Sequence, residues 1–341
     1  MPSYSTRVVT TLLAEREGLQ RVELDDGSRA YVLTELIGPV DAGDRVVVNT
    51  TAVDLGLGTG GWHVVHWNLA RDAWAQPGPG SLVKLRYTSL QADLGAAEEE
   101  PGYAPPAVGL AGTPVVACTL HSQVACVTAA LAHTSPWCRV VYVMTDAAAL
   151  PLALSDLVAD LRDAKLVSAT VTCGQAFGGD HEAVNLHSAL EVAVAGADAD
   201  AVVVGPGPGG AGTRSRLGFG GLEVATVVDA TARLGGRPVL AVRFSAADAR
   251  ARHRGVSHHT AAALWAADHP ALVAVPRGAA LATELLQGRH QVLEVDVPDV
   301  GALLAGRGLD VRTMGRSVDD DPAFFRWAAA AGIAAGQLVG R

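Results

Sequence analysis

The segment from Arg243 to Trp265 concentrates side chains that could do acid/base chemistry. It reads RFSAADARARHRGVSHHTAAALW and brings seven basic residues together: Arg243, Arg250, Arg252, His253, Arg254, His258 and His259. Ser257 precedes an alanine-rich run and is a typical N-cap, which places His258 and His259 in the first turn of a helix. The helix dipole disfavours positive charge there, so we expect neutral imidazoles that can accept a proton or bind a metal. The alternative is that one histidine packs or caps and the other is solvated.

A glycine-rich loop after the apolar run 201–204 is the second candidate. Its sequence, GPGPGGAGT, contains G-x-G-x-x-G, but a chain with 38 glycines in 341 residues produces such matches easily. Pro206 and Pro208 lack N–H donors, and no lysine is near enough to make a P-loop. What remains is an anion nest beside Arg214 and Arg216. Its members would be Gly205, Gly207, Gly209, Gly210 and Thr213, and Arg243 would supply the counter-charge. A loop that packs tightly and binds nothing fits the sequence equally well.

Three shorter motifs add acid/base and nucleophile candidates. Asp146 could act as a base or cap the next helix. Asp180 and Glu182 in GGDHEAVN could act as an acid or base or bind a metal ion. A helix cap is the more economical role for Asp180. His121 and Ser122 could form a nucleophile pair, but G-x-S-x-G is absent and Ser122 fits an N-cap better.

A metal site is a further possibility, although we assign no residue to it. Its candidate ligands are His253, His258, Asp180 and His181, whose spacing matches no known ligand motif.

The elements that must position these residues fall into two regions. Residues 1–88 read as short strands with a hairpin turn at Asp26-Gly27, which predicts a small β-barrel-like domain. Residues 89–113 hold a run of acids and several prolines and indicate a linker or crossing loop. In residues 114–341, short apolar runs alternate with helical segments, which predicts a doubly wound α/β domain with about six or seven mostly parallel strands.

This fold class indicates where a site would lie. Ligands of open α/β sheets bind outside the carboxyl ends of the strands, and the polar clusters follow the predicted strands directly. We therefore expect His121, Asp146, the 205–213 loop and Arg243 to open onto one crevice.

Composition limits the partners. The net charge is −9, without a Lys/Arg cluster of the kind that binds nucleic acid, and lysine occurs only at Lys84 and Lys165. No apolar stretch has signal-peptide or transmembrane character, so we expect a cytoplasmic protein with no membrane partner. An α/β domain this apolar favours self-association as a homodimer.

Several segments resemble a known family. They are VNTTAVDLGLGTGGWHVVHWN, LHSQV, VYVMTDAAALPLALSDLV, GQAFGGDHEAVNLHSAL, VVVGPGPGGAGT and RHRGVSHHT. Together they are similar to an uncharacterised bacterial family, domain of unknown function 3866, most clearly from Val47 to about Thr260. The resemblance implies one shared architecture that joins the β-region to the α/β domain, and it implies no reaction, cofactor or catalytic residue.

The favoured function is an enzyme, a hydrolase or group transferase, that acts on a small anionic or phosphorylated metabolite. Asp146, Glu182 or His258 would serve as acid or base. The alternatives are a non-catalytic ligand-sensing or scaffold protein and a metal-dependent hydrolase.

Overall fold

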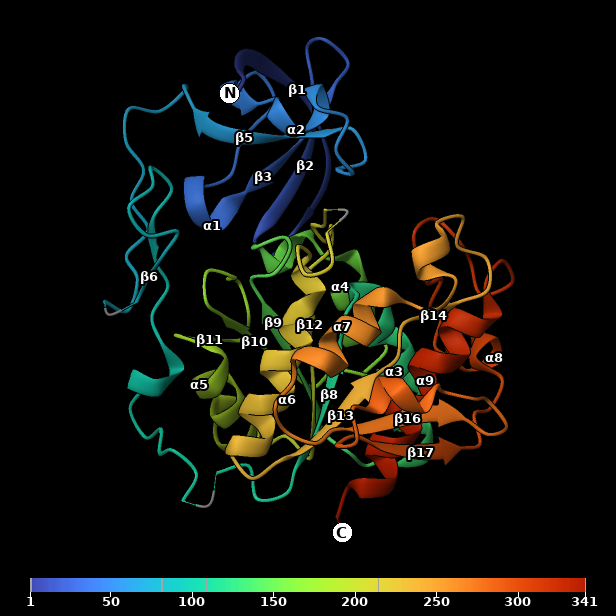
Figure 1. Ribbon diagram of the computed structural model, residues 1–341. Coiled ribbons are helices and arrows are strands. Elements are labelled where there is room, and N and C mark those ends of the chain that lie inside the picture. The colour runs from blue at the N-terminus through green and yellow to red at the C-terminus, as the bar shows by residue number, and fades with distance from the viewer. Residues whose placement is uncertain (1, 81, 108, 214, 341) are drawn as a thin grey trace. The chain divides into compact units, whose positions relative to one another are not determined.

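The structure is a computed structural model that describes residues 2–80, 82–107, 109–213 and 215–340 (Figure 1). The chain divides into two compact units, Met1–Gly95 and Ala96–Arg341. Within the described residues, none of the helices has the length and apolar character needed to cross a membrane.

The first unit contains a closed five-stranded barrel, which confirms the predicted β-barrel-like region. Its strands are β1 (Tyr4–Arg16), β2 (Leu19–Leu24), β3 (Arg29–Leu33), β4 (Arg45–Asn49) and β5 (Trp62–Asn68), in the order β1-β2-β3-β5-β4. Alternate side chains such as Val22, Leu24 and Val32 point into the barrel and are buried. The hairpin between β2 and β3 turns at Gly27, whose φ of +78° is in the region that favours glycine. Short elements complete the unit: α1 (Thr34–Ile37), α2 (Thr51–Asp54), β6 (Val83–Lys84) and β7 (Ala92–Asp93).

The second unit is built on an eight-stranded sheet in which every neighbouring pair is parallel. The strands are β8 (Pro114–Cys118), β9 (Val140–Thr145), β10 (Ala169–Cys173), β11 (His181–Ala183), β12 (Ala201–Pro206), β13 (Arg237–Ala241), β16 (Leu272–Pro276) and β17 (Gln291–Val295). Their order is β11-β10-β9-β12-β8-β13-β16-β17. The α/β prediction is confirmed, with β11 as an additional edge strand in the GGDHEAVN segment.

Helices cover both faces of this sheet, as the doubly wound prediction requires (Figure 1). One face packs against α3 (His121–Thr134), α4 (Asp156–Asp163), α8 (Val300–Ala305) and α9 (Pro322–Leu338). The other packs against α5 (Leu186–Glu191), α6 (Val224–Arg233) and α7 (His258–Ala266). Along β9, Tyr142 and Met144 face the first layer, whereas Val141 and Val143 face the second.

Short turns and a hairpin join these elements. They are η1 (Ala97–Glu99), η2 (Leu152–Leu154), η3 (Val192–Gly196), η4 (Gly220–Glu223), η5 (Ala251–His253), η6 (Thr283–Leu286), β14 (Phe244–Ser245) and β15 (Gly255–Val256). β14 and β15 pair antiparallel directly after β13.

The chain leaves the neighbouring strands β8 and β13 in opposite directions along the sheet. After β8 it crosses β12 to reach β9, and after β13 it runs to β16. Such a switch point is where ligands of open α/β sheets bind. The buried Gln123 ties the two strand ends together: its Oε1 accepts from the Thr119 amide at 2.9 Å, and its Nε2 donates to the Val242 carbonyl at 3.2 Å.

Candidate functional site

The residues expected at one rim follow four adjacent strands. His121 follows β8, Asp146 follows β9, Gly207 follows β12, and Arg243 lies just beyond β13. These strands are neighbours in the order β9-β12-β8-β13 and all are parallel, so their carboxyl ends share one edge. The densest group of chemically capable side chains lies at the β13 end of that edge.

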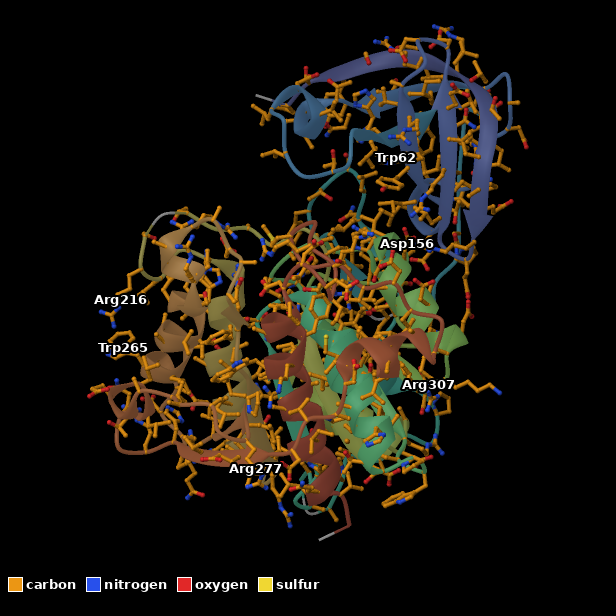
Figure 2. All side chains as sticks on the ribbon, turned by 90° about the vertical axis from the view of Figure 1, so that its right-hand side faces the viewer. Trp62, Asp156, Arg216, Trp265, Arg277 and Arg307 are labelled. Atoms are coloured by element: carbon orange, nitrogen blue, oxygen red, sulfur yellow. The ribbon has the colours of Figure 1, made fainter. Side chains whose placement is uncertain are left out.

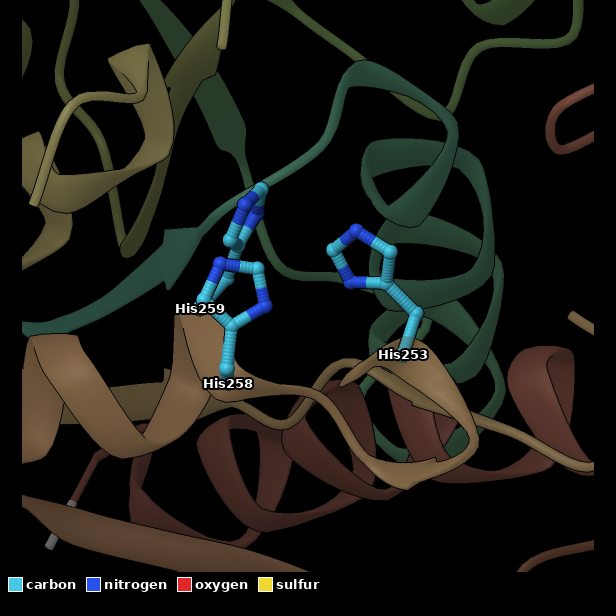
Figure 3. A group of neighbouring side chains, drawn as sticks. All are labelled: His253, His258 and His259. Carbon is cyan, nitrogen blue, oxygen red and sulfur yellow. The ribbon is translucent and has the colours of Figure 1, made fainter. Parts of the chain in front are cut away.

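Three histidines form the centre of this group (Figure 3). The ring of His253 faces those of His258 and His259, and a ligand nitrogen from each lies within 4.8 Å of the others. The β14–β15 hairpin brings η5, which carries His253, back beside the first turn of α7, which begins at His258. Ser257 is the N-cap, as predicted, and its Oγ accepts the His259 amide at 3.2 Å.

All three imidazoles are held neutral. Burial, with the charge of Arg243 added, lowers the pKa of His253 to about 3 and that of His259 to about 2. Burial also lowers the pKa of His258. The expectation of neutral imidazoles is confirmed, and burial is the largest cause of the lowered pKa values.

Hydrogen bonds fix which ring nitrogens carry protons. His258 Nδ1 lies 3.3 Å from the Arg252 carbonyl, which can only accept, so Nδ1 is protonated and Nε2 presents its lone pair. His259 Nδ1 lies 2.8 Å from Arg243 Nη1, which can only donate, so this ring carries its proton on Nε2. His253 Nδ1 lies 2.7 Å from Ser257 Oγ, and its Nε2 accepts from Arg252 Nε at 3.3 Å.

A mostly buried ionic network surrounds the histidines. The Arg243 side chain is only 5% exposed, and burial lowers its pKa to about 10, which leaves it charged at neutral pH. Asp248 pairs with Arg250 at 2.9 Å, and this contact holds the pKa of Asp248 well below its usual range. Arg316 bridges Asp248 and the fully buried Asp321. With Arg252 and Arg254 included, arginines outnumber carboxylates in this network, so its net charge is positive inside an acidic protein.

The segment that follows the glycine-rich loop contacts the histidines through Phe219. The Phe219 ring stacks on His259 with centroids 3.7 Å apart and meets His258 edge-on. Farther out, Arg216 lies 4.0 Å over the ring of Trp265 on α7 (Figure 2). No local sequence pattern indicates a role for Phe219, because its partner His259 lies forty positions away in the chain.

The glycines of this loop have two different roles. Gly205 and Gly207 allow close packing: a Cβ on Gly207 would lie 2.6 Å from the Ala149 carbonyl oxygen. Gly209 and Gly210 are exposed, with nothing within 4 Å of an added Cβ. The Thr213 hydroxyl bonds within the loop, to Ser215 and Gly218. Tight packing therefore describes the first half of the predicted anion nest, and Arg214 lies outside the described residues.

The sequence matches a known protein family. One family, described as Protein of unknown function (DUF3866), matches residues 29–332. The chain belongs to this family. Neither the curated proteins nor the solved structures gave a match.

Asp180 does not join the histidines, which corrects the predicted metal ligand set. It lies beside β11, at the far edge of the sheet from β13, and Arg162 binds its carboxylate at 2.8 and 2.9 Å. The Thr170 amide and hydroxyl donate to it as well. Asp180 is not a helix cap either, because Asn185 caps α5. His181 lies on the same edge strand.

Glu182 is buried and holds the turn before β11. Its Oε1 accepts the Gly178 amide at 2.7 Å, and its Oε2 accepts the Thr172 hydroxyl at 2.7 Å. These contacts give the carboxylate a structural role, and we leave Glu182 out of the proposed reaction.

His121 pairs with Ser155 and not with Ser122. Its Nδ1 donates to the Pro206 carbonyl at 3.0 Å, so its Nε2 accepts the Ser155 hydroxyl at 2.7 Å. Burial lowers the pKa of His121 to about 4. Ser155 is the buried N-cap of α4, whereas Leu120 is the N-cap of α3, so the predicted N-cap role of Ser122 is wrong. Ser122 instead donates to Thr313 Oγ1 at 3.1 Å.

Asp146 is exposed and accepts the Gln175 amide at 2.9 Å, so it does not cap α4.

Glu223 is a carboxyl group at the carboxyl edge of the sheet that the sequence analysis did not identify. Burial raises its pKa, and the negative charge of Asp146 raises it further, against the effect of the Thr145 hydroxyl. An acid immediately before α6 was the available signal.

Proposed function

We propose that the protein is an enzyme, a hydrolase or group transferase, that acts on a small anionic or phosphorylated metabolite at the carboxyl end of β13. The observation that carries the proposal is the buried guanidinium of Arg243 beside three neutral imidazoles. Permanent positive charge next to unprotonated ring nitrogens suits a substrate that needs both charge neutralisation and activation of an attacking group.

The charge distribution supports an anion of limited size. Arg243 supplies a buried charge, and Arg250 and Arg252 are the more exposed donors around it. The protein as a whole carries −9, so its surface repels long polyanions while this local positive field attracts a small one.

The imidazoles provide the reactive lone pairs. His258 is fixed by the Arg252 carbonyl so that Nε2 presents its lone pair, and the ring is only half-buried. In the proposed reaction this side chain helps to activate water or another acceptor, while the arginines hold the anion. Asp146 and Glu223, after β9 and before α6, are the carboxyl groups on the same rim that can exchange protons.

Binding of inorganic phosphate and of a panel of phosphate monoesters and carboxylates tests the proposal. Calorimetry should show that Arg243→Gln weakens phosphate binding by about tenfold or more, because a charge-assisted hydrogen bond is lost. Arg277→Gln is the matched control, since Arg277 pairs with Asp296 at the exposed end of another strand. Equal phosphate affinity in wild type and Arg243→Gln would refute the anion site.

Turnover distinguishes the enzyme from a ligand sensor. His258→Gln should keep phosphate affinity within a fewfold and abolish hydrolysis or transfer of whichever ester binds. Tight binding of an ester that the wild-type protein leaves unchanged, with water or an added alcohol as acceptor, would favour the non-catalytic alternative.

A further inference from the structure

The histidine group has the composition of a metal site. It holds three imidazoles from one short segment, residues 253–259, with their ligand nitrogens within 4.8 Å of one another (Figure 3). Imidazole nitrogen is a preferred ligand of zinc and other divalent transition metals, and only the unprotonated nitrogen binds. We infer that His253, His258 and His259 bind one such ion, which deepens the proposed function because the ion would lie beside the anion held by the arginines.

Two of the three rings already have the outer contacts that metal-bound histidines use. A ligating imidazole donates its other N–H to a carbonyl or another oxygen, which fixes its orientation. His258 Nδ1 does so to the Arg252 carbonyl at 3.3 Å. His253 Nδ1 lies 2.7 Å from Ser257 Oγ, whose position is fixed by the His259 amide. His258 can therefore present Nε2 to an ion. His253 Nε2 accepts from Arg252 Nε at 3.3 Å, so an ion that takes this nitrogen displaces the Arg252 guanidinium.

The third ring is shared with Arg243. His259 Nδ1 accepts a hydrogen bond from Arg243 Nη1 at 2.8 Å, so an ion that takes this nitrogen displaces Arg243. Stacking on Phe219 keeps the ring plane fixed while the partner changes. Displacement releases a guanidinium N–H for the anion. The ion and the anion thus support each other at this site.

The ligand number also fits. Zinc sites that perform catalysis have three protein ligands and leave a fourth position for water or substrate. Nitrogens bound to one tetrahedral zinc lie roughly 3.4 Å apart, so nitrogens up to 4.8 Å apart must approach by as much as about 1.4 Å, which side-chain rotation can supply. The fourth position would face the substrate, where the ion would polarise an oxygen of the bound anion. With the ion bound, His258 Nε2 would be a ligand, so His258 would activate water through the ion and not as a base.

The surrounding charge opposes a bare cation. Arg243, Arg250 and Arg252 repel a divalent ion, and a bound anion offsets that repulsion. We therefore expect Co²⁺ to bind more tightly in the presence of inorganic phosphate than in its absence. Arg243→Gln should bind Co²⁺ more tightly than wild type and phosphate more weakly.

Titration with Co²⁺ tests the site, because tetrahedral Co²⁺ bound to histidine absorbs visible light. Protein without a polyhistidine tag is treated with a chelator and titrated, with elemental analysis to give the stoichiometry. Wild type should bind one equivalent. His253→Ala and His258→Ala should each weaken binding by at least tenfold, since loss of an outer-shell partner alone costs about that much. His187→Ala, which removes an exposed histidine at the start of α5, is the matched control and should bind as wild type does.

The outcomes separate this inference from the proposed function. Absence of a stoichiometric Co²⁺ spectrum, or a spectrum unchanged in both alanine variants, overturns the metal site even if phosphate still binds. Normal Co²⁺ binding with no phosphate binding that depends on Arg243 overturns the proposed function and leaves the metal site standing. Circular dichroism verifies that each variant is folded, and a variant that fails this check is replaced by His258→Asn or His253→Asn.

Discussion

Lowering the pH should destabilise the second unit of the metal-free protein through His253. The His253 side chain is buried, and burial lowers its pKa to about 3 in the folded protein. In the unfolded chain the pKa of histidine is about 6.5. The folded protein therefore stays unprotonated at pH 5 while the unfolded chain binds a proton. The stabilisation is fully present above about pH 6.5 and is lost as the pH falls towards the folded-state pKa.

The magnitude follows from this difference. Between pH 7 and pH 5, preferential protonation of the unfolded chain at one such histidine costs about 2 kcal/mol of unfolding free energy. With a folded-state pKa of about 3, the folded ring is almost entirely neutral at pH 5, so protonation of the unfolded chain sets the value.

Urea unfolding followed by circular dichroism at 222 nm measures this cost in the second unit, which holds all the helices longer than four residues. The comparison is the loss of unfolding free energy between pH 7 and pH 5 in wild type and in His253→Gln. The variant loses the contact with Ser257 and starts less stable at pH 7, but its loss on acidification should be smaller by about 2 kcal/mol. His187→Gln controls for removal of a histidine as such. Equal losses in wild type and His253→Gln would refute the argument that His253 is held neutral by burial.

Three further predictions test the packing and the corrected roles of individual residues. Gly207→Ala should lower the unfolding free energy in the urea assay by about 1–3 kcal/mol, because the added Cβ would meet the Ala149 carbonyl. Gly210→Ala is the control: its Cβ would have open space, so the unfolding free energy should change by less than about 0.5 kcal/mol. Gln123→Leu should cost about 2 kcal/mol or more by the same measurement, since buried groups of Thr119 and Val242 lose their partner; a neutral result would contradict its bridging role. Asp180→Asn should lower the unfolding free energy by about 1 kcal/mol, because the half-exposed ion pair with Arg162 is lost. Phosphate and Co²⁺ binding should stay unchanged. A change in either titration would contradict the position of Asp180 far from the site.

The barrel strands can be predicted because burial alternates along them, as in β2 and β4. Seven of the parallel strands can be predicted for a different reason: they are short apolar runs between helical segments, buried on both faces in β8, β9 and β12. The expectation that a site lies at the strand ends follows from this topology. The edge strand β11 has only three residues, too few for any period, and its pairing depends on hydrogen bonds made by Asp180 and Glu182.

Local capping was predictable where the signal lies within a few residues, as at Ser257. Side-chain partnerships across the chain were not. His121 meets Ser155 from a different helix, and His259 meets Phe219 and Arg243, because loops and strand register bring these residues together. His253 and His258 were candidate ligands because both lie in one short basic segment, although their spacing matches no known motif. His259 takes the place of Asp180 and His181, which the sheet order puts at the opposite edge.

A crystal of the protein soaked with tungstate, an anion of phosphate shape with strong anomalous scattering, tests the central claim most directly. The anomalous peak should lie beside His258, within hydrogen-bond distance of the Arg243 or Arg252 guanidinium, and it should vanish in Arg243→Gln crystals. A peak confined to the exposed 209–213 loop, or a wild-type crystal with no peak at the end of β13, would contradict an anion site there.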